Sequence, residues 1–455
     1  MKILLFVFLC FSFHNKLYAQ EQWKSYPYQD LSSDIIFPDD EGRHNLVTHM
    51  EWWYAVMHLE GKETKNKYSV LVSHFNNQIR FFTITNRSTK KHSSGTTLGI
   101  LNSAKGHLDL RHRTIYGTDL FKSKRDSNNK LIPFNYQIKT HYKKMFIDVE
   151  LSAIKRPLMV QGNGYVDIGT SGKSWYYSLT RLDVSGKISH DGIEEEVTGM
   201  AWMDHQWGPF IVSPIEIGNL FESYEWFCLQ LDNGTDIMIS NIFDRDNNLP
   251  ETPEYGGVDI SRPDGTSITV HDKEFIRTSY WQDPQSGKFM SMGWNLNIPS
   301  EGLNLSLAPF SKNQMVNLPL GGSFWEGALK VTGTINGEDI KGKGFGELIH
   351  RYQLPKIKFY SLDRSYHVSD EVNIKWSIEN KDEGNPLQYK LELITESGKS
   401  FLLVDSLKVN KYLFKLGQLE NAEKLKSFQL SLTAYSVDKV ISNSKLSKRI
   451  EIIQN

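Results

Sequence analysis

Asp204, His205 and Trp207 lie within one short run, Gly199–Gly208, that reads GMAWMDHQWG. A carboxyl group held beside tryptophan in a low-dielectric pocket has a raised pKa and can donate a proton at neutral pH. A neighbouring imidazole can orient that acid or hold a water molecule, and an indole ring can face a carbocation. These three residues are therefore our candidate catalytic residues, for chemistry that begins with proton donation.

Strand geometry places a condition on this cluster. Alternate side chains of an extended strand share a face, so Asp204 would lie opposite His205 and Trp207. The catalytic interpretation therefore needs a bend or bulge near Asp204. In the alternative interpretation, Asp204 and His205 satisfy backbone groups at a crossover between domains, and the tryptophans belong to the core.

Other acidic and aromatic residues are candidates for the wall of a ligand pocket. Glu51 lies in the run EWWY and is either a second acid with a raised pKa or the partner of an arginine such as Arg181. Asp236 stands just inside the strand that follows an Asn-Gly turn, which makes it a weaker acid candidate. The candidate ligand-binding residues are Glu51, Trp53, Tyr177, Trp202 and Asp236.

Two further glutamates and several histidines are assigned no chemistry. Glu326 and Glu347 each closely follow an aromatic residue, and we favour structural roles for both. His49, His58 and His74 lack the helical HxxxH spacing of a zinc site, so no metal is assigned. The sequence contains no Gly-x-Ser-x-Gly elbow, phosphate loop or dinucleotide fingerprint, and no cofactor is expected.

The elements that must position these residues are short strands. Alternating apolar and polar runs recur along the chain, separated by Gly, Asn, Asp and Lys turns; examples are residues 68–73, 146–151 and 329–335. The last of these runs ends in Asn336-Gly337, which suits a two-residue hairpin. This pattern predicts an all-β protein built from barrels or sandwiches. Seven further strand-like runs after Pro355 predict an immunoglobulin- or fibronectin-like sandwich.

The N-terminus has the pattern of a secretory signal. Lys2 precedes the apolar run at residues 3–13, and Leu17-Tyr18-Ala19 is a plausible cleavage site, so residues 1–19 are expected to be a signal peptide. Export to the periplasm or beyond follows from this. Of the two cysteines, only Cys228 would remain after cleavage, which leaves no intramolecular disulfide. The net charge of −1 gives no indication of the excess positive charge that nucleic-acid-binding proteins usually carry.

Four segments stand out in order along the chain: HMEWWY from His49, WYYSLTRL from Trp175, GMAWMDHQWG from Gly199, and FWEG from Phe324 paired with GKGFGE from Gly342. Together, in this order and spacing, they resemble the carotenoid 1,2-hydratase (hydroxyneurosporene synthase) and AttH-like lipocalin family. The resemblance covers roughly residues 40–352. It implies two calycin-type barrels, at residues 20–203 and 204–354, followed by the sandwich at 355–455, which lies outside the family core.

The resemblance also implies a function. The family example is cofactor-independent hydration of a carotenoid-type alkene, in which an acid protonates the double bond and water adds to the resulting carbocation. Asp204 would be the proton donor, assisted by His205 and Trp207. One alternative is a non-catalytic carrier of lipid-like molecules in the cell envelope, peripherally associated with its membrane. Another is an exported lyase or cyclase acting on a different polyene or polyketide. In each case the partner is a hydrophobic small molecule.

Overall fold

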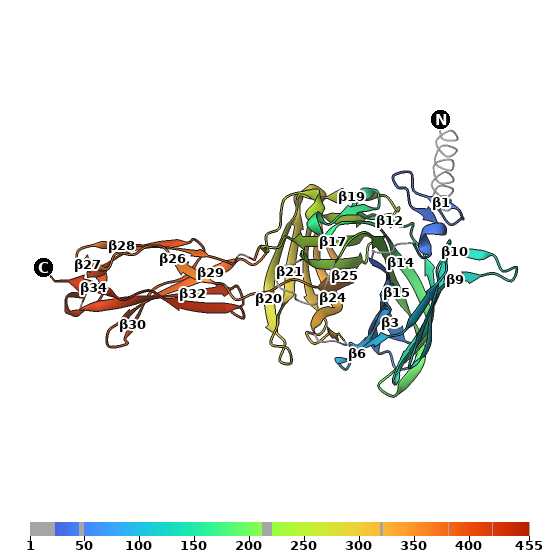
Figure 1. The fold of residues 1–455 in the computed structure, drawn as a ribbon, viewed down its shortest axis with the longest axis horizontal. Coiled ribbons are helices and arrows are strands. Elements are labelled where there is room, and N and C mark those ends of the chain that lie inside the picture. The colour runs from blue at the N-terminus through green and yellow to red at the C-terminus, as the bar shows by residue number, and fades with distance from the viewer. Residues whose placement is uncertain are drawn as a thin grey trace, which may run out of the picture. The chain divides into compact units, whose positions relative to one another are not determined.

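The computed structural model describes residues 23–44, 50–211, 221–318, 322–380, 382–420 and 422–454, which form strands and short turns (Figure 1). The predicted signal peptide and His49 lie outside these residues. The three example runs are all strands, and Asn336-Gly337, with positive φ at both residues, joins β24 (Ser323–Ile335) to its antiparallel partner β25 (Glu338–Leu348). The all-β prediction is therefore confirmed. The helices in the described residues are 3₁₀ turns: η1 (Asp39–Glu41), η2 (Val160–Gly162), η3 (Gly169–Ser171), η4 (Pro253–Tyr255), η5 (Pro299–Glu301), η6 (Leu416–Gln418) and η7 (Ala422–Lys424). Within the described part of the chain, none of them has the length or the apolar character to span a membrane.

The contacts divide the chain into two units, of which unit 1 contains residues 1–245, 249–273 and 297–350. Its first sheet is nearly closed into a barrel and is antiparallel throughout. The order is β6 (Lys91–Leu98), β5 (Ile79–Asn86), β4 (Lys67–Phe75), β3 (Met50–Gly61), β15 (Ile193–Gly208), β14 (Lys173–His190), β11 (Met145–Ala153), β10 (Leu131–Tyr142), β9 (Gly117–Arg125), β8 (Asp109–Thr114) and β7 (Ile100–Ser103). Two short strands, β12 (Leu158–Met159) and β13 (Tyr165–Asp167), also pair with β14, while β1 (Tyr28–Gln29) and β2 (Ile36–Phe37) form a separate pair.

A second antiparallel sheet in unit 1 follows the first in the chain. Its order is β19 (Ser267–Val270), β18 (Val258–Ser261), β17 (Asp236–Phe243), β16 (Ser223–Leu231), β25 (Glu338–Leu348), β24 (Ser323–Ile335) and β22 (Leu303–Pro309), with β23 (Met315–Asn317) on β24. The expected boundary between Met203 and Asp204 falls inside β15. That strand stays paired with β3 as far as Gly208, so Asp204 belongs to the first sheet.

Unit 2 contains residues 246–248, 274–296 and 351–455 and holds all seven of the strand-like runs after Pro355. One sheet has the order β26 (Ile357–Phe359), β28 (Glu371–Ile378) and β31 (Lys411–Lys415). The other has the order β27 (Ser365–His367), β34 (Ile450–Ile453), β32 (Ser427–Ser436), β29 (Leu387–Thr395) and β30 (Ser400–Leu407), with β33 (Ser442–Leu446) on β32. Alternate residues of both sheets share one apolar core, which is the pattern of a sandwich. Of two further strands, β20 (Glu274–Gln282) lies wholly in this unit and β21 (Phe289–Ile298) lies largely in it.

A buried ion pair joins β20 to the loop after β28 within unit 2. Arg277 Nη1 lies 2.6 Å from Asp382 Oδ1, and both side chains are almost inaccessible to solvent. Removing one member of a buried pair leaves the other charge in low dielectric, which costs about 3 kcal/mol or more. We therefore expect Asp382→Ala to lower the free energy of unfolding by about that amount in urea titrations. Glu379→Gln, at an exposed pair with Lys356, is the control and should leave the unfolding curve unchanged.

Candidate active site

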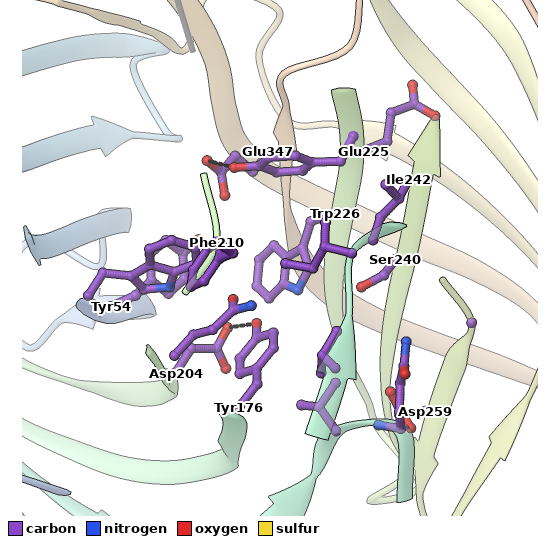
Figure 2. A pocket seen from close by; sticks show the side chains of 18 residues that line it. Tyr54, Tyr176, Asp204, Phe210, Glu225, Trp226, Ser240, Ile242, Asp259 and Glu347 are labelled. Atoms are coloured by element: carbon purple, nitrogen blue, oxygen red, sulfur yellow. Dashed lines mark hydrogen bonds between the residues drawn. The ribbon is translucent and has the colours of Figure 1, made fainter. Parts of the chain in front are cut away.

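A pocket in unit 1 is lined by residues of both sheets and encloses about 80 Å3 (Figure 2). One wall comes from β3, β14 and β15 of the first sheet, and the other from β16, β17, β18 and β25 of the second. The side chains that carry its chemistry are carboxyl groups, tyrosines and large aromatic rings. They include Trp52, Tyr54, Tyr176, Asp204, Phe210, Tyr224, Trp226, Asp259 and Glu347.

Asp204 is held by three hydrogen bonds. Tyr176 donates its hydroxyl to Asp204 Oδ2 at 2.6 Å, and Ser178 Oγ and Trp202 Nε1 donate to Oδ1 at 2.5 and 2.7 Å. Ser178 stands directly opposite Asp204 in the β14–β15 ladder, so this arrangement follows from strand register. Burial raises the pKa of Asp204 to about 6, against the lowering effect of its three donors. The carboxyl is therefore mostly ionised at neutral pH and fixed in orientation.

Glu347 projects from β25 toward the same pocket (Figure 2). Its neighbours across the ladders are Trp226 on one side and Glu326 on the other. Gly346 leaves room for Phe227 on the opposite face of the sheet, because a Cβ at that position would lie 2.9 Å from the Phe227 ring. Tyr224 donates a hydrogen bond to Glu347 Oε1 at 2.9 Å.

The two glutamates hold a proton near neutral pH. Burial raises the pKa of Glu347 to about 7. Burial and the nearby Glu347 carboxylate raise the pKa of Glu326 well above its usual value. Two buried carboxyl groups side by side cannot both ionise cheaply, so at least one stays protonated. The sequence had favoured structural roles for both; the structure instead places Glu347 in the pocket wall and Glu326 beside it.

Three tyrosines complete the polar part of the site. Tyr54 donates to Glu326 Oε1, as Tyr176 does to Asp204 and Tyr224 does to Glu347. Burial raises the pKa of each hydroxyl well above 10, so all three remain protonated donors. None of them was among the sequence candidates. The alternation of side chains in EWWY and WYY could have indicated two of them. One strand face carries the candidates Glu51, Trp53 and Tyr177, and the other carries Trp52, Tyr54 and Tyr176.

Aromatic rings form the apolar part of the pocket. The Tyr54 and Trp226 rings meet edge to face with centroids 5.5 Å apart, and Trp52 meets Phe210 in the same way at 5.1 Å. Ring faces stabilise an adjacent positive charge through their quadrupole. Asp259 also lines the pocket, where it accepts hydrogen bonds from the Gln161 backbone at 3.0 Å and from Thr269 Oγ1 at 2.5 Å.

The structure does not bring the three candidate catalytic residues together. The β3–β15 register runs without a break from Val197 to Gly208, so the bulge required near Asp204 is not there. The irregularity lies in β14 instead, between Leu179 and Leu182. His205 and Trp207 consequently face the interior of the first sheet, away from Asp204. The candidate ligand-binding residues Glu51, Trp53 and Tyr177 also face that interior and not the pocket.

The suggested pairing of Glu51 with Arg181 does not form. Glu51 lies against His44 and His205, and Arg181 pairs with Asp236 at 2.6 Å. Lys155 Nζ also contacts Asp236, at 2.9 Å. Asp236 therefore forms a buried, neutralised link between the two sheets and does not line the pocket. The fifth candidate, Trp202, supports Asp204 without lining the pocket.

The fold and the site together define a class of protein. It is an all-β scaffold in which two sheets surround a pocket lined by acidic and aromatic side chains. The sequence model of the AttH-like family matches residues 29–352, and the chain belongs to this family. The fold is shared with an AttH protein from Nitrosomonas europaea, at 19% identity and TM-score 0.56, over 72% of this chain and 100% of that one. It is also shared with kievitone hydratase from Nectria haematococca, at 18% identity and TM-score 0.55, over 71% and 98% of the two chains. The predicted family and lipocalin-like fold are confirmed. No curated protein sequence shows significant similarity to the chain.

Proposed function

We propose that this protein adds water across a carbon–carbon double bond of a hydrophobic small molecule bound between the two sheets. The observation that carries the proposal is the set of buried carboxyl groups, each with a tyrosine donor, around an aromatic pocket. Hydration needs one group to give a proton, another to receive one, and a surface that tolerates a cation. The pocket supplies all three.

Glu347 is the proton donor in this proposal and Asp204 the acceptor. The three hydrogen bonds to Asp204 favour its charged form, whereas Glu347 accepts one from Tyr224 and lies beside a second acid. This reverses the role that the sequence suggested for Asp204. His205 and Trp207 have no direct part, since both point away from the pocket.

The atoms and electrons of the proposed hydration balance without a cofactor. The π electrons of the double bond form a C–H bond with the Glu347 proton, which leaves a cation on the more substituted carbon. The rings of Tyr54 and Trp226 face that charge. A water oxygen then forms the C–O bond and loses its proton to Asp204, and proton exchange with water restores both carboxyl groups.

The size and lining of the pocket support a proposal for the class of substrate. A volume of about 80 Å3 accommodates a double bond with its immediate substituents but not an entire long polyene. This favours reaction at one end of an acyclic terpenoid or carotenoid chain, whose remainder lies outside the pocket. The hydratase named among the similar folds supports the same reaction class. The apolar N-terminal run supports an exported enzyme that meets its substrate in the cell envelope.

Isotope incorporation tests the proposal. The purified protein is incubated with an acyclic terpenoid alkene in oxygen-18 water, and the product is analysed by mass spectrometry. We expect an alcohol carrying one labelled oxygen, formed without added metal or nucleotide. Tight binding of the alkene with no labelled product would contradict hydration and favour the carrier function. Identification of the molecule that copurifies, by native extraction, then defines the ligand class.

A further inference from the structure

His44, Glu51 and His205 converge inside the first sheet, on the face of β15 opposite to the pocket. Glu51 Oε1 lies 2.8 Å from His44 Nδ1 and 3.2 Å from His205 Nε2. One donor atom from each of the three residues falls within 4.8 Å of the other two. We propose that these side chains bind a divalent transition-metal ion, for which Zn2+ is the best fit.

The donor set selects the class of ion. Two imidazole nitrogens and one carboxylate oxygen suit Zn2+ and its neighbours in the first transition row, whereas Ca2+ and Mg2+ prefer oxygen ligands alone. Ligands bound at about 2.0–2.2 Å around one ion lie roughly 3–3.5 Å from each other. The two distances at Glu51 are close to that spacing. Three protein ligands leave a further coordination position for water.

Neighbouring groups hold the two imidazoles in place. Asp40 Oδ1 lies 3.0 Å from His44 Nε2, so this ring can donate to a carboxylate while Nδ1 faces Glu51. A histidine that binds a metal commonly donates a hydrogen bond from its other ring nitrogen to a carboxylate, which fixes the orientation of the ring. The His44 ring stacks on Trp207 at 4.1 Å and 4°, and the His205 ring stacks on Trp53 at 4.8 Å and 18°.

The burial pattern gives the ion a dry site with one open side. Glu51 and His205 are at most 1% exposed, whereas the His44 side chain is 19% exposed. An ion can therefore reach the cluster past His44. Within the described part of the chain, no other three His, Cys, Asp or Glu side chains converge in this way. The nearby buried pair His74 and His112 brings only two imidazoles together, with 3.1 Å between their Nδ1 atoms.

The competing explanation is a hydrogen-bonded network without an ion. Glu51 accepts from the His44 backbone N–H at 3.1 Å, and the same carboxylate can accept from both rings. Such a network would also satisfy these buried groups. Metal binding is therefore the property that separates the two explanations.

The test uses the full chain, stripped with a chelator, dialysed, and titrated with Zn2+ or Co2+. We expect one equivalent of metal to survive gel filtration, a visible absorption band from bound Co2+, and a Zn2+-dependent rise in melting temperature. His44→Ala and Glu51→Gln each remove one ligand and should weaken binding at least about 100-fold. Asp40→Asn, which changes only the outer support, should weaken it about 10- to 100-fold.

His107→Ala is the matched control, because His107 is also partly exposed and lies outside the cluster. It should bind metal like the unmodified chain. The proposal is overturned if the unmodified chain retains no metal, or if folded His44→Ala binds metal as tightly as His107→Ala. Circular dichroism and melting curves establish that each variant is folded. Because the cluster and the pocket lie on opposite faces of β15, loss of metal binding and loss of hydration are distinguishable outcomes.

Discussion

Glu347→Gln should lower the rate of alkene hydration by at least about 100-fold, because it removes the proton that begins the reaction. The amide retains an oxygen that can accept the hydrogen bond from Tyr224, so the pocket should keep its shape. Affinity for the alkene should change little, since the lost interaction belongs to the transition state. The measurements are single-turnover rate and equilibrium binding of the same substrate.

Glu338→Gln is the matched control for this variant. Glu338 lies on the same strand, β25, but is exposed and far along the strand from the pocket. It should retain the activity of the unmodified protein. If Glu347→Gln also retains it, Glu347 is not the acid, and Glu326 becomes the carboxyl to test because it is buried directly beside Glu347 in the β24–β25 ladder.

Asp204→Asn should have a second large effect, visible in the pH profile. The proposed reaction requires ionised Asp204 and protonated Glu347, and burial raises their pKa values to about 6 and about 7. The rate at subsaturating substrate should therefore rise as pH increases through about 6 and fall as pH increases through about 7, as a narrow bell. Asp204→Asn removes the base, so it should lower the rate about 100-fold or more and abolish the acidic limb.

Asp183→Asn is the control for this measurement, since Asp183 is exposed on the neighbouring strand β14. Its pH profile should match that of the unmodified protein. The two carboxyl groups interact, so the two limbs report the pair and not each residue alone. An acidic limb that persists in Asp204→Asn would assign that titration to another group and contradict the proposed base.

Local patterns in the sequence were sufficient to predict the strands and to single out Asp204, which lines the pocket. Alternation defines two faces of a strand, but it does not tell which face meets the pocket. That is why Glu51, Trp53 and Tyr177 were chosen where Trp52, Tyr54 and Tyr176 line the wall. A register shifted by one residue exchanges the two sets of side chains completely.

The role of Glu347 could not be predicted because its environment is assembled from distant segments. Tyr224 precedes it by 123 residues, and they meet only because β16 pairs with β25. The partner of Tyr54 on β3 is more distant still, since Glu326 lies 272 residues further along the chain on β24. A single sequence shows which residues are present, but it does not show which distant residues come into contact in the fold. The same holds for the contact between Glu51 and His205, which are 154 residues apart in the chain.

The contacts around Asp236 join the two sheets that form the walls of the pocket, so they set the width of that pocket. Asp236 on β17 pairs with Arg181 on β14 of the first sheet and with Lys155, which lies between β11 and β12. Gln230 on β16 donates hydrogen bonds to the backbone oxygens of Thr180 and Ala201 at 2.7 and 2.9 Å. These polar contacts hold the two walls of the pocket at one spacing, and none of them involves Asp204, Glu326 or Glu347. Under the proposed function, substitutions at these cross-sheet contacts would change the width of the gap between the two walls without replacing Asp204, Glu326 or Glu347.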